Sequence, residues 1–268
     1  MFRDAAGVLT TFHLAFHRLV VVDQAPPAPG KWLACVIPFG EQRAKRVAST
    51  IRSMAASHQL YPQYPRPVDY GLSLLLGKGA LANGIYSPLP GRDGFTCATL
   101  IADLLQRAGA KLVDATTWVG TPKGEAWGRA IVCMLRAWPA TEEHIRIVEA
   151  NNAGVRMRPE EVAAAAETYE KRPKRQDELA ERAAEIFDEV QARCDPAQMP
   201  QSPDMRACVV TYMGEIAALS ELAAAEAPRP DGNPAPDARE PQPAQALPGQ
   251  GGIERGGLPG QDEPADGL

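Results

Sequence analysis

The chain has 268 residues, of which 45% are hydrophobic and 23% are charged, and its formal net charge at pH 7 is −5. This length and apolar content suffice for a buried core in one or two domains. The charge balance excludes the basic surface that nucleic-acid binding requires, and no apolar run is long enough to cross a bilayer, so we expect neither a nucleic-acid partner nor a membrane span.

The N-terminal part of the chain is predicted to combine strands with one helix. Residues 8–22 are rich in β-branched and aromatic side chains, which predicts a strand. After a proline-rich break, residues 31–39 predict a second strand that can pair with the first in antiparallel fashion. Residues 41–57 then change to helical periodicity. A short helix or turn over residues 69–76 and a loop up to Gly94 follow.

The clearest predicted element is a helix over residues 95–108. Its apolar residues recur at helical spacing, and Gly109 stands where a helix usually ends with a glycine. Further helices are predicted from this kind of pattern over residues 124–138, from Thr141 onward, and over residues 159–171, 176–194 and 204–226.

The predicted fold class is α+β, in three parts. Residues 1–172 are expected to form one domain, and residues 173–226 a helical extension. Residues 227–268 contain mainly Pro, Gly, Ala, Asp and Gln, so we expect a disordered tail that lacks the apolar surface to fold. The C-terminal helices and this tail could bind a protein partner, although mixed charge on a helix usually marks a solvated face.

The five cysteines are scattered, and none forms a CxxC motif, so a zinc ribbon or a thioredoxin site is not predicted. They are Cys35, Cys97, Cys133, Cys194 and Cys208. An odd count, without a signal peptide in the first thirty residues, fits free thiols in a reducing compartment. We therefore expect a soluble cytoplasmic protein, with export by a signal-independent route left open.

Cys97 is the candidate nucleophile, because a glycine-bearing loop leads directly into it and a helix begins there. A helix N-terminus favours the thiolate and should lower the thiol pKa, as a nucleophilic cysteine requires. Backbone N–H groups near Cys97, in the loop that includes Gly94 and Thr96, could stabilise an oxyanion. The alternative is that Cys97 is an ordinary core residue.

His13 and His17 are the candidate bases. Four positions apart in one predicted strand, they would share a face about 13 Å apart, so one of them could reach the thiol. Alternatively, each is an ordinary core or surface imidazole. A metal pair is not favoured, since His-Leu-Ala-Phe-His lacks the Glu of HExxH and no third ligand is evident, so no metal or cofactor is expected. His58 and His144 are expected to be solvated.

A catalytic histidine usually needs a third group to orient it. If residues 8–22 and 31–39 form a hairpin, the residue opposite His13 falls near Glu41 or Gln42. Asp23 and Asp93 are equally open candidates.

Three short motifs together resemble those of the circularly permuted NlpC/P60 papain-like hydrolases. They are His-Leu-Ala-Phe-His in a strand, Glu-Gln-Arg-Ala-Lys-Arg-Val-Ala in a helix, and Gly-Phe-Thr-Cys-Ala-Thr-Leu-Ile at a helix start. The resemblance extends over about residues 8–165 and includes the order of His before Cys. It implies a small antiparallel sheet packed on the helix that bears the cysteine, with Cys97 as nucleophile, His13 as base and His17 as a second imidazole.

Three functions remain open from the sequence. The first is a cysteine hydrolase that cleaves an amide, peptide or isopeptide bond through a Cys97 thioester, with a peptide, a protein or a small amide as substrate. The second is an acyltransferase or thioesterase that uses the same pair of residues on a lipid or another acyl substrate. The third is a non-catalytic binding or scaffold protein that retains the fold.

Overall fold

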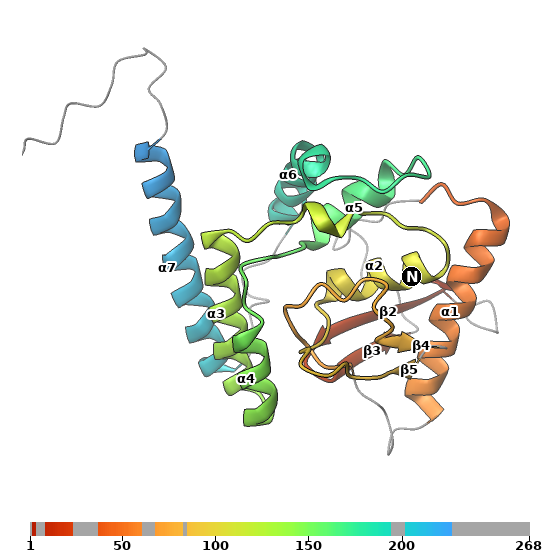
Figure 1. Ribbon diagram of the computed structural model, residues 1–268, viewed down its shortest axis with the longest axis horizontal. Helices are drawn as coiled ribbons and strands as arrows, with labels where there is room; N and C mark the ends of the chain where they lie inside the picture. Colours follow the sequence, from red (N-terminus) through yellow and green to blue (C-terminus); the bar gives the residue numbers. More distant parts are fainter. Residues whose placement is uncertain are drawn as a thin grey trace, which may run out of the picture. The chain divides into compact units, whose positions relative to one another are not determined.

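The computed structural model shows an α+β protein in which helices predominate over two small antiparallel sheets (Figure 1). It describes residues 2–3, 9–23, 37–60, 68–82, 85–193 and 202–226. The strands are β1 (Phe2–Arg3), β2 (Leu9–Phe16), β3 (Leu19–Asp23), β4 (Leu81–Ala82) and β5 (Ile85–Tyr86). The helices are α1 (Glu41–Leu60), α2 (Cys97–Arg107), α3 (Pro122–Arg136), α4 (Glu142–Ala150), α5 (Pro159–Glu167), α6 (Gln176–Arg193) and α7 (Pro203–Glu226), with a 3₁₀ turn at Ala115–Thr117.

The strand predicted over residues 8–22 is in fact a hairpin. The chain turns back at His17 and Arg18, where Arg18 has a φ of 56°, and β3 pairs antiparallel with β2. Residues 31–39 are therefore not the partner of β2: residues 37–39 lie outside any strand, and residues 31–36 fall outside the described part. Because this turn contains neither glycine nor proline, the sequence carries no turn signal there, and residues 8–22 therefore predict one continuous strand.

The register of the hairpin also differs from the prediction. Val21 lies opposite His13, in place of Glu41 or Gln42. The pairing shifts between Leu14 and Phe16, so an irregularity interrupts the alternation of side chains between the two histidines. His17 consequently lies in the turn beyond β2, and the prediction that both histidines share one face of a straight strand is wrong.

Residues 69–76 do not form the predicted short helix: apart from the bridge at Tyr70 they lie outside regular secondary structure, and a turn begins only at Leu76. Tyr70 forms a parallel bridge with Phe95, in which the Phe95 N–H donates to the Asp69 carbonyl oxygen at 2.9 Å and the Gly71 N–H donates to the Phe95 carbonyl oxygen at 3.2 Å. An apolar run of this length fits a helix or a buried strand equally well. The pairing across the chain decided between them.

The carboxylate of Asp93 holds this segment in place. It is 1% exposed and accepts hydrogen bonds from the backbone N–H groups of Leu72, Ser73 and Gly94. A buried carboxylate is stable only when it is well hydrogen-bonded, and these three donors satisfy it. Asp93, one of the open candidates to orient a histidine, instead supports the loop before Cys97.

The predicted helices are confirmed, with shifts at their ends. α2 begins at Cys97 behind the N-cap Thr96, and Gly109 follows its end with a φ of 85°. α3 begins at Pro122, two residues before the predicted start, because Thr121 caps it. α5 ends at Glu167, earlier than predicted.

The helix α2 lies between two apolar clusters. On one side, Leu100 and Leu104 belong to the cluster that contains Phe12 and Leu14 of β2. On the other side, Ala98, Ala102 and Leu105 belong to a second cluster with residues of α5 and α6. The helix that bears Cys97 therefore packs on β2, as Figure 1 also shows.

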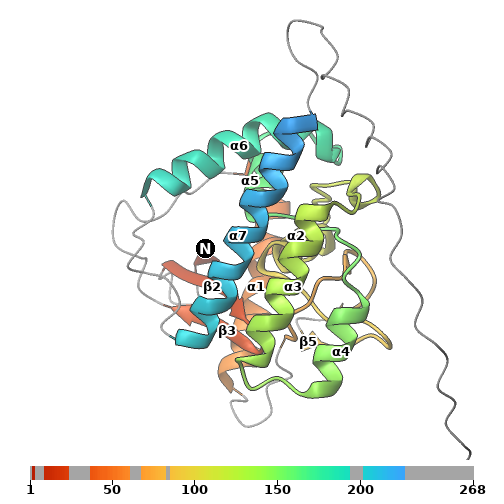
Figure 2. The ribbon, with the colours of Figure 1, turned by 90° about the vertical axis from the view of Figure 1, so that its left-hand side faces the viewer.

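The C-terminal helices join the same folded body, and the described residues up to Ala225 belong to one compact unit. α6 packs on α5, and Leu179, Ala183 and Ile186 complete the second cluster. α7 lies alongside α3 (Figure 2). The tail predicted over residues 227–268 lies outside the described residues.

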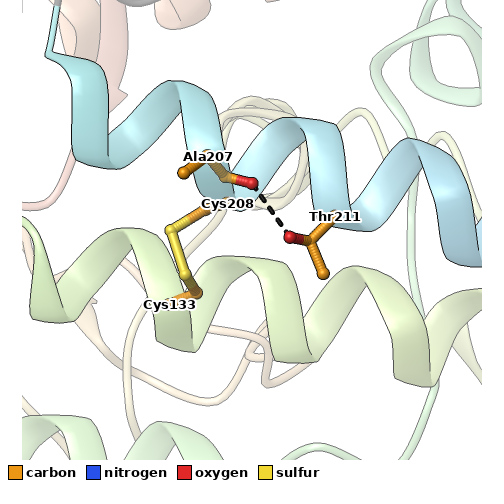
Figure 3. The surroundings of a disulfide bond; sticks show 4 residues. All are labelled: Cys133, Ala207, Cys208 and Thr211. Atoms are coloured by element: carbon orange, nitrogen blue, oxygen red, sulfur yellow. Dashed lines mark hydrogen bonds between the residues drawn. A yellow bond between two sulfur atoms is a disulfide. The ribbon is translucent and has the colours of Figure 1, made fainter.

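A disulfide between Cys133 of α3 and Cys208 of α7 joins these two helices (Figure 3). The expectation of free thiols is therefore wrong for this pair, because only the fold brings residues 75 positions apart together. Cys35 and Cys194 lie outside the described residues. No helix in the described part of the chain combines the length and apolar character needed to span a membrane.

Candidate functional site

Cys97 occupies the first position of α2, where a capping box holds the helix start. The Thr96 hydroxyl oxygen accepts the Thr99 N–H at 3.1 Å, and the Thr99 hydroxyl oxygen accepts the Thr96 N–H at 2.8 Å. Gly94, just before the cap, has a φ of 143°, and a Cβ there would lie 2.0 Å from the Asp69 carbonyl oxygen. Only glycine fits this close approach, so the backbone before Cys97 has little freedom.

The amides of Gly94 and Thr96, which were predicted to face an oxyanion, are engaged within the loop. The Gly94 N–H donates to Asp93 Oδ1 at 3.1 Å, and the Thr96 N–H donates to Thr99. The N–H groups that interact with the sulfur are those of Cys97 itself and Ala98.

Cys97 is a free thiol that is half-buried. Burial raises its pKa above the usual value, while hydrogen bonds from the backbone N–H groups of Ala98 and Cys97 act in the opposite direction. Arg156 also lowers the pKa, and Glu160 raises it. Desolvation thus outweighs the helix N-terminus, and the expected lowering of the pKa is wrong.

Tyr70 is the third side chain close to the thiol. Its pKa is raised by burial and further by the negative charge that Cys97 would carry. The phenol therefore stays protonated at neutral pH. No sequence signal marked this residue, because the bridge between Tyr70 and Phe95 arises only from the fold.

The backbone of Tyr70 holds two imidazoles on its other side. Its N–H donates to His17 Nδ1 at 3.2 Å, and its carbonyl oxygen accepts a hydrogen bond from His144 Nε2 at 2.8 Å. The two ring centroids are 4.4 Å apart. His144 was predicted to be solvated but is buried, because α4 packs this side chain against the segment around Tyr70.

Asp69 completes this cluster, and its carboxylate pairs with Arg18 at 2.8 Å. The pKa of His17 is lowered to about 4, chiefly by burial and then by His144, although Asp69 raises it. His17 is therefore neutral at pH 7.

The three side chains His17, Asp69 and His144 are the group among the described residues whose atoms could hold a metal ion, with one ligand atom of each within 4.8 Å of the others. Since His17 Nδ1 accepts a hydrogen bond, the neutral ring carries its proton on Nε2. In this arrangement His17 and His144 are hydrogen-bonded to the Tyr70 backbone, and Asp69 is paired with Arg18.

His13 lies in the middle of β2 and is half-buried. Because side chains alternate along a strand, it occupies the face opposite Phe12 and Leu14, the residues that share a cluster with α2. The described interactions thus connect His17 with His144 and Asp69, and Cys97 with Tyr70, Arg156 and Glu160. Of the two sequence-predicted histidines, neither is among the groups that shift the Cys97 pKa.

Sequence reasoning missed Tyr70, His144 and Arg156, because residues from three separate segments meet here only after folding. No protein-family model, curated protein or solved structure matches this chain.

Proposed function

We propose that the protein is a cysteine hydrolase with a permuted papain-like fold, which cleaves an amide or peptide bond through a thioester on Cys97. The observation that carries the proposal is the free, half-buried thiol at the first position of a capped helix, where the backbone N–H groups of Ala98 and Cys97 act to lower its pKa. The packing of α2 on the β2 hairpin also supports it.

The reaction needs a base, because burial keeps the thiol protonated. His17 is 2% exposed and its Nδ1 already accepts the Tyr70 N–H, so the proposal keeps His13 as the base. Because His13 lies on the face of β2 opposite the residues that pack with α2, the proposal requires β2 to rearrange, or a water molecule to carry the proton, before His13 can act on the thiol. In the proposed reaction, His13 takes the thiol proton and the sulfur attacks the amide carbon. The N–H groups of Cys97 and Ala98 donate to the oxyanion, and His13 returns the proton to the leaving amine before water hydrolyses the thioester.

Thiol labelling tests the nucleophile. The full-length protein is treated with iodoacetamide near neutral pH, and the rate at each cysteine is measured by peptide mass spectrometry. We expect Cys97 to react faster than Cys35 and Cys194. The His13→Gln variant should slow the reaction of Cys97, whereas His17→Gln should not remove the contribution of His13 to that rate. Slow labelling of Cys97 at the rate of Cys35 and Cys194 would rule out an activated thiol.

A non-catalytic binding protein is the second candidate. The raised pKa of Cys97 and the lack of a histidine among the described groups that shift it favour this alternative. Cleavage of a panel of fluorogenic peptide and acyl amides that is abolished by Cys97→Ser would exclude it, whereas identical traces for both proteins would support it.

A further inference from the structure

Arg156 is held by two helices at the edge of the Cys97 site. Its guanidinium carbon lies 4.0 Å from the ring centroid of Trp127 on α3, and its Nη1 donates to the hydroxyl oxygen of Tyr212 on α7 at 2.9 Å. The two aromatic rings also pack edge to face, with centroids 5.3 Å apart. These contacts position the planar guanidinium before any ligand binds.

The positive charge of Arg156 has no acidic partner among the described residues. Its neighbour Arg158 pairs with Glu160 at 3.3 Å and with Glu161 at 3.4 Å, but no described carboxylate lies within ion-pair distance of Arg156. The one hydrogen bond that its side chain makes within the described part uses Nη1. The donors at Nε and Nη2 are therefore available to a ligand.

This charge acts directly on the Cys97 site. Arg156 lowers the pKa of both Cys97 and Tyr70, and its effect on Cys97 exceeds the opposing effect of Glu160. Packing explains the proximity, since Met157 next to Arg156 is buried in the same cluster as Ala98 next to Cys97. An anion bound at Arg156 would thus lie within the range over which this charge acts on Cys97.

We infer that Arg156 forms a carboxylate-binding subsite beside Cys97, and that the substrate carries a carboxylate close to the bond that is cleaved. A guanidinium with two open donors matches the two oxygens of a carboxylate. The statement about the substrate rests on the proposed hydrolase function, whereas the subsite itself does not.

Two reagents of nearly equal size test the subsite, because iodoacetate carries a carboxylate where iodoacetamide carries a neutral amide. Alkylation of Cys97 by each reagent is measured in the full-length protein by peptide mass spectrometry, with N-acetylcysteine as the reference thiol. We expect the ratio of the iodoacetate rate to the iodoacetamide rate to exceed that of the reference about tenfold. The iodoacetate reaction should saturate, and both propionate and added salt should inhibit it.

Variants assign this preference to the guanidinium. Arg156→Gln should return the ratio to the reference value. Arg156→Lys keeps the charge but loses the planar set of N–H donors, and should retain part of the increase in the ratio. Arg146→Gln removes an exposed charge from α4 and should leave the ratio unchanged.

The outcomes separate the subsite from the proposed function. A ratio equal to the reference in the unmodified protein, or no saturable reaction of Cys97 with iodoacetate, overturns the subsite even if amide hydrolysis is found. A raised ratio that depends on Arg156 supports the subsite even if no hydrolysis is found.

Discussion

At the scale of single residues, Tyr70 connects the two polar groups of the site. Its backbone binds His17 and His144, while its phenol interacts electrostatically with Cys97. This arrangement predicts a pH dependence that the sequence does not reveal.

Acidification should destabilise the fold through His17. Its pKa is about 4 in the folded protein and about 6.5 when unfolded, so its contribution is complete above pH 6.5 and is lost as pH falls from 6.5 towards 4. Between pH 7.5 and pH 5 the free energy of unfolding should fall by about 2 kcal/mol from this residue. The groups that face it are His144, Asp69 and Arg18, and urea titrations at both pH values measure the effect.

The control for this prediction is His17→Gln, which keeps a hydrogen-bond acceptor but cannot be protonated. The variant should be less stable than the unmodified protein at pH 7.5 and should lose less stability on acidification. If the variant and the unmodified protein lose the same amount of stability between pH 7.5 and pH 5, His17 does not titrate between these pH values.

Gly94 provides a second prediction at this scale. Gly94→Ala should lower the free energy of unfolding by about 2 kcal/mol or more, because the added Cβ would meet the Asp69 carbonyl oxygen and the backbone has a positive φ. Gly40→Ala is the matched control, since no atom lies within 4 Å of its Cβ position, and should change stability by less than about 0.5 kcal/mol. Denaturant unfolding of both variants compares them, and equal effects would contradict the argument.

At the scale of elements, α2 was predictable because its signals are local. The apolar stripe, the threonine before Cys97 and the glycine after the helix all lie within a few residues of the helix. The hairpin was not predictable in the same way. Its turn at His17 and Arg18 lacks a turn signal, and its register depends on which side chains the core buries.

The cap of α2 supports a prediction about the thiol as well as about stability. Thr96→Ala should cost about 1 kcal/mol, because the Thr99 N–H loses its acceptor, and it should also change the alkylation rate of Cys97. Thr121→Ala removes the corresponding cap of α3, where the hydroxyl accepts the Gly124 N–H at 3.0 Å. It should cost a similar amount while the Cys97 rate stays constant. Equal alkylation rates of Cys97 in the two variants would show that the cap of α2 does not affect the reactivity of the thiol.

At the scale of the whole molecule, α7 is attached to the body by the disulfide and by Met205, Val209 and Tyr212, which pack against the apolar cluster that also contains Phe12 and Leu14. Tyr212 contacts Trp127 and Arg156, and Glu215 pairs with Arg129 at 2.9 Å. Its other face leaves Val210, Met213 and Leu222 exposed. The disulfide therefore adds a covalent link to a helix that is also held by apolar packing.

Loss of the disulfide should lower the stability of the folded body. The bond closes a loop of 75 residues, and chain entropy alone assigns it about 4 kcal/mol. Replacing Cys133 and Cys208 together with serine should lower the urea midpoint, and dithiothreitol should lower that of the unmodified protein to a similar value. Cys97→Ser should keep the sensitivity to dithiothreitol, and a protein insensitive to the reductant would show that the bond contributes nothing.

The sequence by itself determined the local features of this protein: the helices, the glycine that follows α2 and the α+β class. It also placed Cys97 at the start of α2. These follow from neighbouring residues, since helical periodicity, capping and glycine conformations act over a few positions.

The tertiary structure alone decided which distant groups meet. It placed His17 against His144 instead of Cys97, brought Arg156 to the thiol, and joined Cys133 to Cys208. It also reversed the expected direction of the Cys97 pKa, because desolvation depends on everything that packs around the sulfur, and local sequence carries no record of that packing.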